Sequence, residues 1–495
     1  MKAGRRSGVL LHPTSLPGPW GVGDLGPSAY RFVDLLQSAR QSVWQILPLT
    51  PVGGYGSPYS PHSLFAGNPL VLSPEILVER GFLGALPDPG PRTANGRAVD
   101  FPSALAFKER LVDAAFEYSH ARVEGDGNYE AFRSKNSPWL EDYSLYYAIS
   151  KEQGRPWYEW PEGIRRREPS ALEEKRALLE ESVERVTFAQ YLFESQWSEL
   201  LGYARSRGVR VLGDVPFYVL HDSVDIWTHM TFFKVDQDGT PSQVAGVPPD
   251  YFSKTGQRWG NPVYDWDALK RTGYAWWKDR LTRSLELADR VRLDHFRGYV
   301  AYWEIPAEET TAVRGRWVRV PGDFLDSVRD SFPELPFVAE DLGEITQDVK
   351  DAIAFLGIPG MRVLEFAFDG TPDNDHLPSN HPRNCYVYTG THDTNTIRGW
   401  FTDEATPGMK SAIGRYLGHE VTVETVSREF VSMALGSVAD VSVIPMQDLL
   451  DLGSEARMNN PATTSGNWRW RVTPAELSEN SFMTLKEQTV SNGRG

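Results

Sequence analysis

The sequence predicts an α/β protein built on a (β/α)8 barrel, the TIM-barrel fold. Eight short runs of β-branched and aliphatic residues, each bounded by Gly, Pro, Asp or His, have the composition of buried parallel strands. Segments with the apolar spacing of helices lie between them, for example Ser28–Ala39 and Phe188–Arg207. Because eight such strand and helix units alternate, a barrel is favoured over an open doubly wound sheet. The expected strands are Gly8–Leu11, Val43–Leu47, Val209–Asp214, Arg290–Asp294, Phe337–Glu340, Met361–Phe366, Cys385–Tyr388 and Val441–Pro445.

The length predicts large insertions in this barrel. A plain barrel needs ~250 residues, so about half of the 495 residues should lie outside it. We expect one barrel domain over 1–495, with a mostly helical subdomain at 52–185 between strands two and three. A second, loop-rich subdomain is expected at 216–272 between strands three and four, where the Gly and Pro residues of GVPPDYFSKTGQRWGNPVYDW disfavour regular structure. Both should emerge at the carboxyl ends of the strands, and 484–495 should be a frayed tail.

Composition limits the partners. A net charge of −15 disfavours binding to nucleic acid or acidic membranes. The single cysteine, Cys385, fits a reducing compartment, and no signal peptide or apolar stretch of about 20 residues is found, so we expect a cytoplasmic protein. We also expect it to be a monomer. The acidic segment Asp214–Asp225 lacks the spacing of a calcium loop, and no Cys/His cluster suggests zinc. We therefore expect no metal and no cofactor.

Three acidic residues follow the ends of expected strands four, five and seven. They are Asp294 in RVRLDHFRG, Glu340 in FVAEDLG and Asp393 in YTGTHDTNT. The carboxyl ends of barrel strands converge on one axis, so these side chains are expected to share a pocket. Two carboxyl groups about 5–5.5 Å apart can cleave a glycosidic bond with retention of configuration, one as nucleophile and the other as acid and base.

These residues predict specific roles. Asp294 is expected to be the nucleophile, Glu340 the general acid and base, and Asp393 the group that holds the sugar hydroxyls in the transition state. Arg292 lies two residues before Asp294, so both side chains face the same way and the guanidinium can keep Asp294 ionised. Simpler readings exist for each residue: a strand-end Asp often caps a helix, and Arg292 could pair with Glu365 instead.

The motifs resemble one family over nearly the whole chain. Stretches such as GVLLHPTSLPGPWGVGDLG, GVPPDYFSKTGQRWGNPVYDW, RLDHFRG, AEDLG, GTHDTNTIRGW and LGSEARMNNPATTSGNWRWR are similar to the 4-α-glucanotransferases called amylomaltase or disproportionating enzyme, glycoside hydrolase family 77. The resemblance implies the same three catalytic positions and no C-terminal β-sandwich domain. It also implies sugar contacts at Tyr59, Asp214, Asp250, Trp259, Arg292, His295, His392 and Asn467.

The resemblance implies transfer of α-1,4-glucan segments from maltodextrin or starch to the 4-hydroxyl of an acceptor, with cyclisation of long glucans as a further outcome. An α-amylase-like hydrolase and a non-catalytic glucan-binding protein are the alternatives. One departure concerns the HD pair: family members often continue with Asn-Asp-Thr, whereas this chain has Thr394-Asn395-Thr396. We expect that this difference tunes the activity without abolishing it.

Overall fold

The computed structural model describes residues 4–53, 56–88, 96–249 and 253–494. Eight parallel strands form a nearly closed barrel in the order β10-β11-β12-β1-β2-β3-β6-β9. This confirms the predicted (β/α)8 class. The strands are β1 (Arg6–Leu10), β2 (Val43–Gln45), β3 (Arg210–Val215), β6 (Arg290–Leu293), β9 (Phe337–Ala339), β10 (Gly360–Val363), β11 (Cys385–Tyr388) and β12 (Val441–Pro445).

The barrel strands are short, and most of their residues are buried. Seven ladders of parallel pairs set the register, and one of them pairs Asp214 of β3 with Arg292 of β6. Inside the barrel, Tyr388 donates a hydrogen bond to Gln45 at 2.9 Å. Helices between successive barrel strands, or after the last, cover the outside: α1 (Pro27–Ser38), α7 (Glu180–Ser206), α10 (Ala275–Leu287), α11 (Asp323–Ser331), α12 (Gln347–Leu356), α13 (Ile397–Asp403), α15 (Val426–Gly436), α16 (Met446–Leu449) and α17 (Glu479–Ser491).

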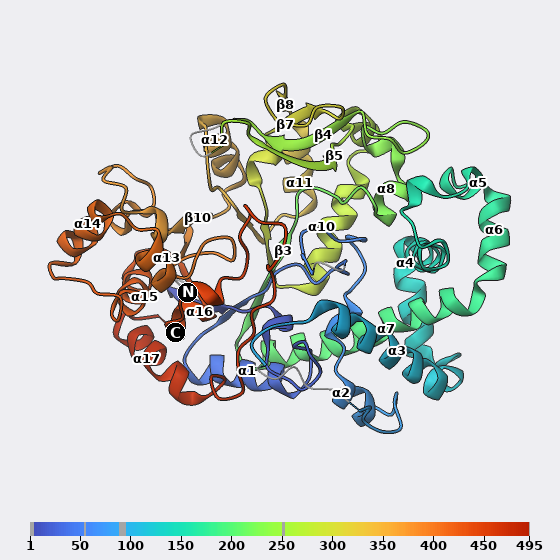
Figure 1. Ribbon diagram of the computed structural model, residues 1–495, viewed down its shortest axis with the longest axis horizontal. Helices are drawn as coiled ribbons and strands as arrows, with labels where there is room; N and C mark the ends of the chain where they lie inside the picture. Colours follow the sequence, from blue (N-terminus) through green and yellow to red (C-terminus); the bar gives the residue numbers. More distant parts are fainter. Residues whose placement is uncertain (1–3, 54–55, 89–95, 250–252, 495) are drawn as a thin grey trace.

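The segment between β2 and α7 is helical in its described part. Helices α3 (Phe101–Val123) and α4 (Gly127–Gln153) are the longest elements there. Asp126 caps the start of α4, and Gly154 ends it in the left-handed conformation. In Figure 1 these helices extend to the right of the barrel. Subdomain boundaries at 52–185 and 216–272 stay predictions. The helices are α2 (Pro74–Glu79), α3 (Phe101–Val123), α4 (Gly127–Gln153), α5 (Glu162–Arg165) and α6 (Pro169–Leu178), with α8 (Val224–Thr228), α9 (Trp266–Arg271) and α14 (Pro407–Leu417) elsewhere in the chain.

A second sheet, which the sequence did not predict, lies beside the barrel mouth (Figure 1). It is antiparallel, in the order β5 (Gln257–Pro262), β4 (Gln243–Val247), β7 (Ala301–Pro306) and β8 (Arg316–Arg319). The expectation that Gly and Pro prevent regular structure in 246–266 is therefore wrong. Gly246 in fact permits the β4–β5 pairing, because a Cβ there would lie 2.2 Å from the Gln257 carbonyl oxygen.

The expectation of a frayed C-terminal tail is also wrong. Helix α17 continues to Ser491, with Leu485 fully buried. The Arg494 guanidinium is 2% exposed and donates hydrogen bonds to the carbonyl oxygens of Arg6, Leu435, Ser437 and Ala439. These bonds join Arg494 to β1 and to the segment before β12. A buried polar side chain therefore fixes the segment that the sequence predicted to be frayed.

Candidate active site

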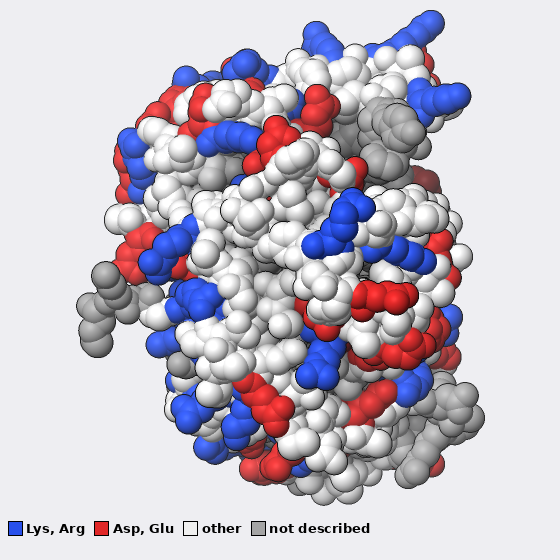
Figure 2. All heavy atoms as spheres, turned by 90° about the vertical axis from the view of Figure 1, so that its left-hand side faces the viewer, with Lys and Arg blue, Asp and Glu red and all other residues white. Residues whose placement is uncertain are grey.

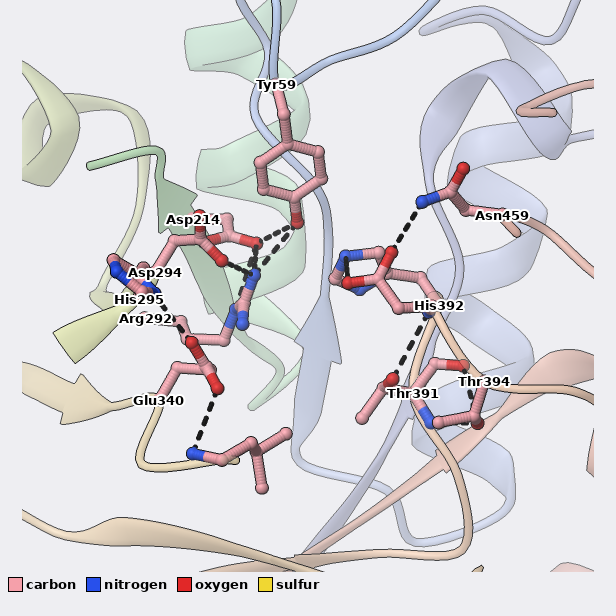
Figure 3. A network of polar contacts seen from close by, with 12 residues as sticks. Tyr59, Asp214, Arg292, Asp294, His295, Glu340, Thr391, His392, Thr394 and Asn459 are labelled. Carbon is pink, nitrogen blue, oxygen red and sulfur yellow. Dashed lines mark hydrogen bonds and ion pairs between the residues drawn. The ribbon is translucent and has the colours of Figure 1, made fainter. Parts of the chain in front are cut away.

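Asp294, Glu340 and Asp393 line one cleft of about 1290 Å³. Asp294 directly follows β6, Glu340 directly follows β9, and Asp393 lies in the loop after β11. Barrel topology therefore brings together residues that are about 50 positions apart in the sequence. Figure 3 shows Asp294 and Glu340 on one side of the site and His392 on the other, with Tyr59 above them.

Arg292 links the Asp294 carboxylate to the barrel interior. Its Nη2 donates to Asp294 Oδ1 at 2.8 Å and to Asp214 Oδ2 at 2.8 Å, and its Nε donates to Asp214 Oδ2 at 3.0 Å. The Asp214 side chain is fully buried and that of Arg292 is 4% exposed, whereas that of Asp294 is 26% exposed. The buried cation thus fixes the position of one carboxylate at the cleft surface through a charge-assisted hydrogen bond. The alternative pairing of Arg292 with Glu365 is not found among the described contacts.

Tyr59 completes this network. Its hydroxyl donates to Asp214 Oδ2 at 2.5 Å and accepts from Arg292 Nη2 at 3.0 Å (Figure 3). Burial, followed by the Asp214 charge, raises the pKa of Tyr59 well above its ordinary value, so the hydroxyl stays protonated. Tyr59 lines the cleft, but Asp214 and Arg292 lie beneath it. Their predicted sugar contacts stay predictions.

Glu340 is held by the backbone. Its Oε2 accepts from the His295 N–H at 2.7 Å and its Oε1 from the Leu342 N–H at 3.0 Å. These bonds favour the anion, but burial and then the Asp294 charge act more strongly and raise the pKa of Glu340 well above its ordinary value. A carboxyl that keeps its proton near neutral pH can act as a general acid.

His295 follows Asp294 in a strained conformation. Its φ of 49° lies in the left-handed region, which only a minority of non-glycine residues adopt. This turn aims the His295 N–H at Glu340 while its ring faces the cleft. Burial lowers the pKa of His295 to about 4, so the ring is neutral and can exchange hydrogen bonds with sugar hydroxyls.

Asp393 is bound on both carboxylate oxygens. His392 Nε2 lies 3.3 Å from Oδ2, and Asn459 Nδ2 donates to Oδ1 at 2.6 Å. Burial acts to raise the pKa of Asp393, but His392 and Asn459 outweigh it and hold the pKa below its ordinary value. Arg457 Nη2 also donates to the Asp393 carbonyl oxygen at 2.9 Å. Sequence reasoning missed Asn459 and Arg457; only their place in the resembling segment LGSEARMNNP pointed to them.

Aromatic rings form the walls of the cleft. Tyr59 stacks on His392 with ring centroids 5.1 Å apart, and Trp468 packs against both rings. On the β5 side, Trp259 is 40% exposed and contacts the His295 ring edge-on at 5.1 Å. Exposed ring faces in a polar cleft suit the flat faces of sugar rings.

Two other predicted contacts have different positions. Asn467 lies in the cleft wall, but its amide is bonded to Asn460 and Thr463, where it closes the 460–467 turn. Asp250 lies outside the described residues. In the described ranges, no group of three or more His, Cys, Asp or Glu side chains is placed to hold a metal ion.

The surface and the helices add two further facts. Positive and negative side chains are interspersed on the face shown in Figure 2. Among the described helices, we found none with the length and apolar character that crossing a bilayer requires.

Comparison with known proteins points to one family. A family described as 4-alpha-glucanotransferase, glycoside hydrolase family 77, matches residues 11–477. The chain is 47% identical to the 4-alpha-glucanotransferase of Thermus thermophilus over the full length of both chains. It is 45% identical to that of Aquifex aeolicus, covering 97% of this chain and 98% of the relative. Among solved structures, amylomaltase from Streptococcus agalactiae in complex with acarbose is 36% identical with a TM-score of 0.93, covering 99% of this chain and 100% of that one.

Proposed function

The chain belongs to the 4-alpha-glucanotransferases of glycoside hydrolase family 77, and on this premise we propose how its residues carry out the reaction. The enzyme transfers segments of α-1,4-glucan from a donor chain to the 4-hydroxyl of an acceptor glucose or glucan. Asp294 is the nucleophile, Glu340 the general acid and base, and Asp393 the transition-state stabiliser. One observation carries this proposal: the three carboxyl groups line one cleft in three different electrostatic environments.

In the first step, Glu340 gives its proton to the glycosidic oxygen of the donor. An Asp294 oxygen forms a bond to the anomeric carbon as the glycosidic bond breaks, and the released chain leaves with a new 4-hydroxyl. Arg292 and Asp214 support this step, because the buried guanidinium is held by Asp214 and in turn orients the Asp294 carboxylate. The raised pKa of Glu340 keeps the acid protonated until the donor binds.

In the second step, the acceptor 4-hydroxyl gives its proton to the Glu340 carboxylate. The acceptor oxygen bonds to the anomeric carbon and the Asp294 carboxylate leaves, so two inversions give net retention. In this proposal Asp393 and His392, whose side chains contact each other, bind hydroxyls of the distorted sugar in both steps. When the acceptor is the other end of the bound segment, the product is a cyclic glucan.

Transfer requires that an acceptor sugar displaces water from the cleft. Tyr59, Trp259 and Trp468 offer ring faces on both walls, and His295, His392 and Asn467 lie beside these rings. A sugar held on these rings places its hydroxyl at an effective concentration above that of water at the intermediate. We propose these residues as donor and acceptor contacts, with Asp214 and Arg292 acting mainly by positioning Asp294.

The three carboxyl groups come from one chain, so no second copy is needed to complete the cleft, and we propose that the enzyme acts as a monomer. We further propose that it acts in the cytoplasm and does not bind nucleic acid, which the net charge of −15 supports.

The maltotriose reaction tests the proposal. Wild-type protein should yield glucose and a ladder of longer chains with almost no net gain in reducing ends. Asp294→Ala should lose at least about a thousandfold in rate, because a double displacement cannot proceed without its nucleophile. Wild-type transfer by Asp294→Ala would refute the nucleophile assignment, and a steady gain in reducing ends by the wild type would indicate a hydrolase.

A further inference from the structure

The barrel has one seam. Ladders of paired residues join seven neighbouring pairs of barrel strands, and none joins β9 to β10 in the described part of the chain. One backbone hydrogen bond of the described residues crosses this seam, from the Ala339 N–H to the Pro359 carbonyl oxygen at 2.8 Å. Glu340, the proposed general acid, directly follows β9. It therefore lies beside the one pair of neighbouring barrel strands that no ladder joins in the described part of the chain.

The side chain of Asp341 bridges the seam. Its Oδ1 accepts from the Met361 N–H of β10 at 2.6 Å, and its Oδ2 accepts from Arg362 Nη1 at 3.0 Å. Gly360 makes room for this contact, because a Cβ there would lie 2.4 Å from Asp341 Oδ2. The carboxylate thus gives the Met361 N–H the acceptor that a neighbouring strand would otherwise supply, and it also binds the Arg362 side chain.

The backbone groups of Glu340 bond to residues on the other side of the strand, away from the seam. Its N–H donates to the Leu293 carbonyl oxygen at 3.1 Å, and its own carbonyl oxygen accepts from the Phe296 N–H at 3.1 Å. Its Oε1 is held by Leu342 N–H, the donor that follows Asp341 in the chain. A shift of Asp341 would therefore displace both the Glu340 peptide and one donor to its carboxylate.

The seam borders a cavity. A cavity of about 740 Å³ is lined by Asp341, Gly360, Arg362, residues of α12 and the segment 375–384. Between β10 and β11 the described residues form the short 3-10 helices η6 (Leu364–Phe366) and η7 (Pro378–Asn380) and no α-helix. Asp341 itself is 9% exposed, so it separates this cavity from the peptide bonds that hold Glu340.

We propose that Asp341 is a positioning residue for the acid and base function of Glu340, acting through the β9–β10 seam together with Arg362. The inference rests on the proposed role of Glu340. It makes a specific prediction: loss of the bridge impairs the steps that move a proton and spares the formation and breakdown of the bond between Asp294 and the sugar.

Two reactions separate these steps. Disproportionation of maltotriose needs a proton transfer in each half-reaction. In contrast, the reaction of α-maltosyl fluoride with azide as the acceptor needs no proton transfer. Fluoride leaves with the bonding electrons as Asp294 bonds to the anomeric carbon, and an azide nitrogen then bonds to that carbon and releases the carboxylate. Glu340→Ala supplies the reference: it should lose maltotriose turnover and retain fluoride release in azide.

Asp341→Asn is the test variant, because an amide has one acceptor oxygen and the seam uses two. Maltotriose kcat should fall about ten- to a hundredfold, with fluoride release in azide within about threefold of wild type. Arg362→Gln keeps the bond between Asp341 and Met361, so it should show the same pattern more weakly. This second variant provides the test if Asp341→Asn folds poorly. Glu194→Gln is the matched control, because it removes the ion pair to the buried Arg283 away from the cleft, and it should leave both reactions unchanged.

Equal losses in both reactions for Asp341→Asn, or no loss in either, would overturn the inference. If Glu340→Ala itself lost both reactions equally, the proposed role of Glu340 would fail instead, so the two failures are distinguishable.

Discussion

Asp214 and Arg292 occupy directly paired positions on β3 and β6, and the buried ion pair between them orients a guanidinium that also binds Asp294. The Asp294 carboxylate is thus fixed by the register of two barrel strands. Burial raises the pKa of Asp214, and the arginine charge opposes this increase. Removing either partner would leave the other buried without its compensating charge.

Replacing this guanidinium tests its role. Arg292→Lys should lower kcat on maltotriose about a hundredfold, because one ammonium cannot bind Asp214 with two nitrogens and Asp294 at the same time. Arg316→Lys is the control, since Arg316 also binds a buried carboxylate, Glu304, with two nitrogens, but outside the cleft. Steady-state kinetics measure both, and an Arg292→Lys kcat within about threefold of wild type would exclude the proposed support.

The stability of the fold should report the raised pKa of Glu340. A carboxyl whose folded pKa exceeds its unfolded pKa binds its proton more tightly when folded, so stability falls as pH rises between the two values. Glu340→Gln removes this effect. Its Tm should equal that of wild type near pH 4 and exceed it by roughly 1–3 °C at pH 8, by calorimetry. A difference that is the same at every pH would show that Glu340 is not held protonated.

Trp259 is expected to favour acceptor sugars over water. Trp259→Ala should raise the fraction of maltotriose cleavages that produce a new reducing end by about fivefold or more, because the acceptor loses a ring face. Trp317→Ala is the control, since Trp317 is also 40% exposed but lies on β8 and does not line the cleft. Reducing-end and glucose assays give the ratio, and equal ratios for the two variants would contradict this role.

Asn395, which departs from the family pattern after the His392–Asp393 pair, binds two side chains. Asn395 Nδ2 donates to Glu404 Oε1 at 2.7 Å and to Ser454 Oγ at 3.0 Å, beside the loop that carries Asp393. Asn395→Asp would place two carboxyl groups in contact, so the variant should lose stability as pH rises from 5 to 8. Adding Glu404→Gln should restore it. Thermal unfolding at both pH values measures this, and an unchanged Tm in the single variant would show that the contact is unimportant.

The barrel was predictable because buried parallel strands are continuous apolar runs with polar boundaries. Two strands, at 385–388 and 441–445, have the predicted bounds. The expected strand Met361–Phe366 extends too far, since Leu364–Phe366 forms a 3-10 helix in which Leu364 is buried and Phe366 is 40% exposed. An apolar residue at the end of a run does not by itself extend the strand. The antiparallel sheet was missed because its strands contain Gly and Pro or, as in Arg316–Arg319, are mostly exposed, so only tertiary pairing identifies them.

The site was predictable to a similar extent. Strand ends located Asp294 and Glu340, because topology alone brings such ends together. No spacing rule connects Asn459 to Asp393, since their contact depends on the path of a loop after the barrel. The same holds for Asp341, whose bond to Met361 depends on where the barrel lacks a ladder. Residues fixed by local pattern could be predicted, and residues fixed by loop path could not.

Trapping the intermediate tests the central claim most directly. Glu340→Gln incubated with α-maltosyl fluoride should accumulate a glycosyl-enzyme, because fluoride departs without acid while the second step lacks its base. Mass spectrometry of peptic fragments should then show a maltosyl adduct on the peptide that contains Asp294, and the adduct should disappear when azide is added. An adduct on a different carboxylate, or a wild-type product of inverted anomeric configuration, would contradict the account.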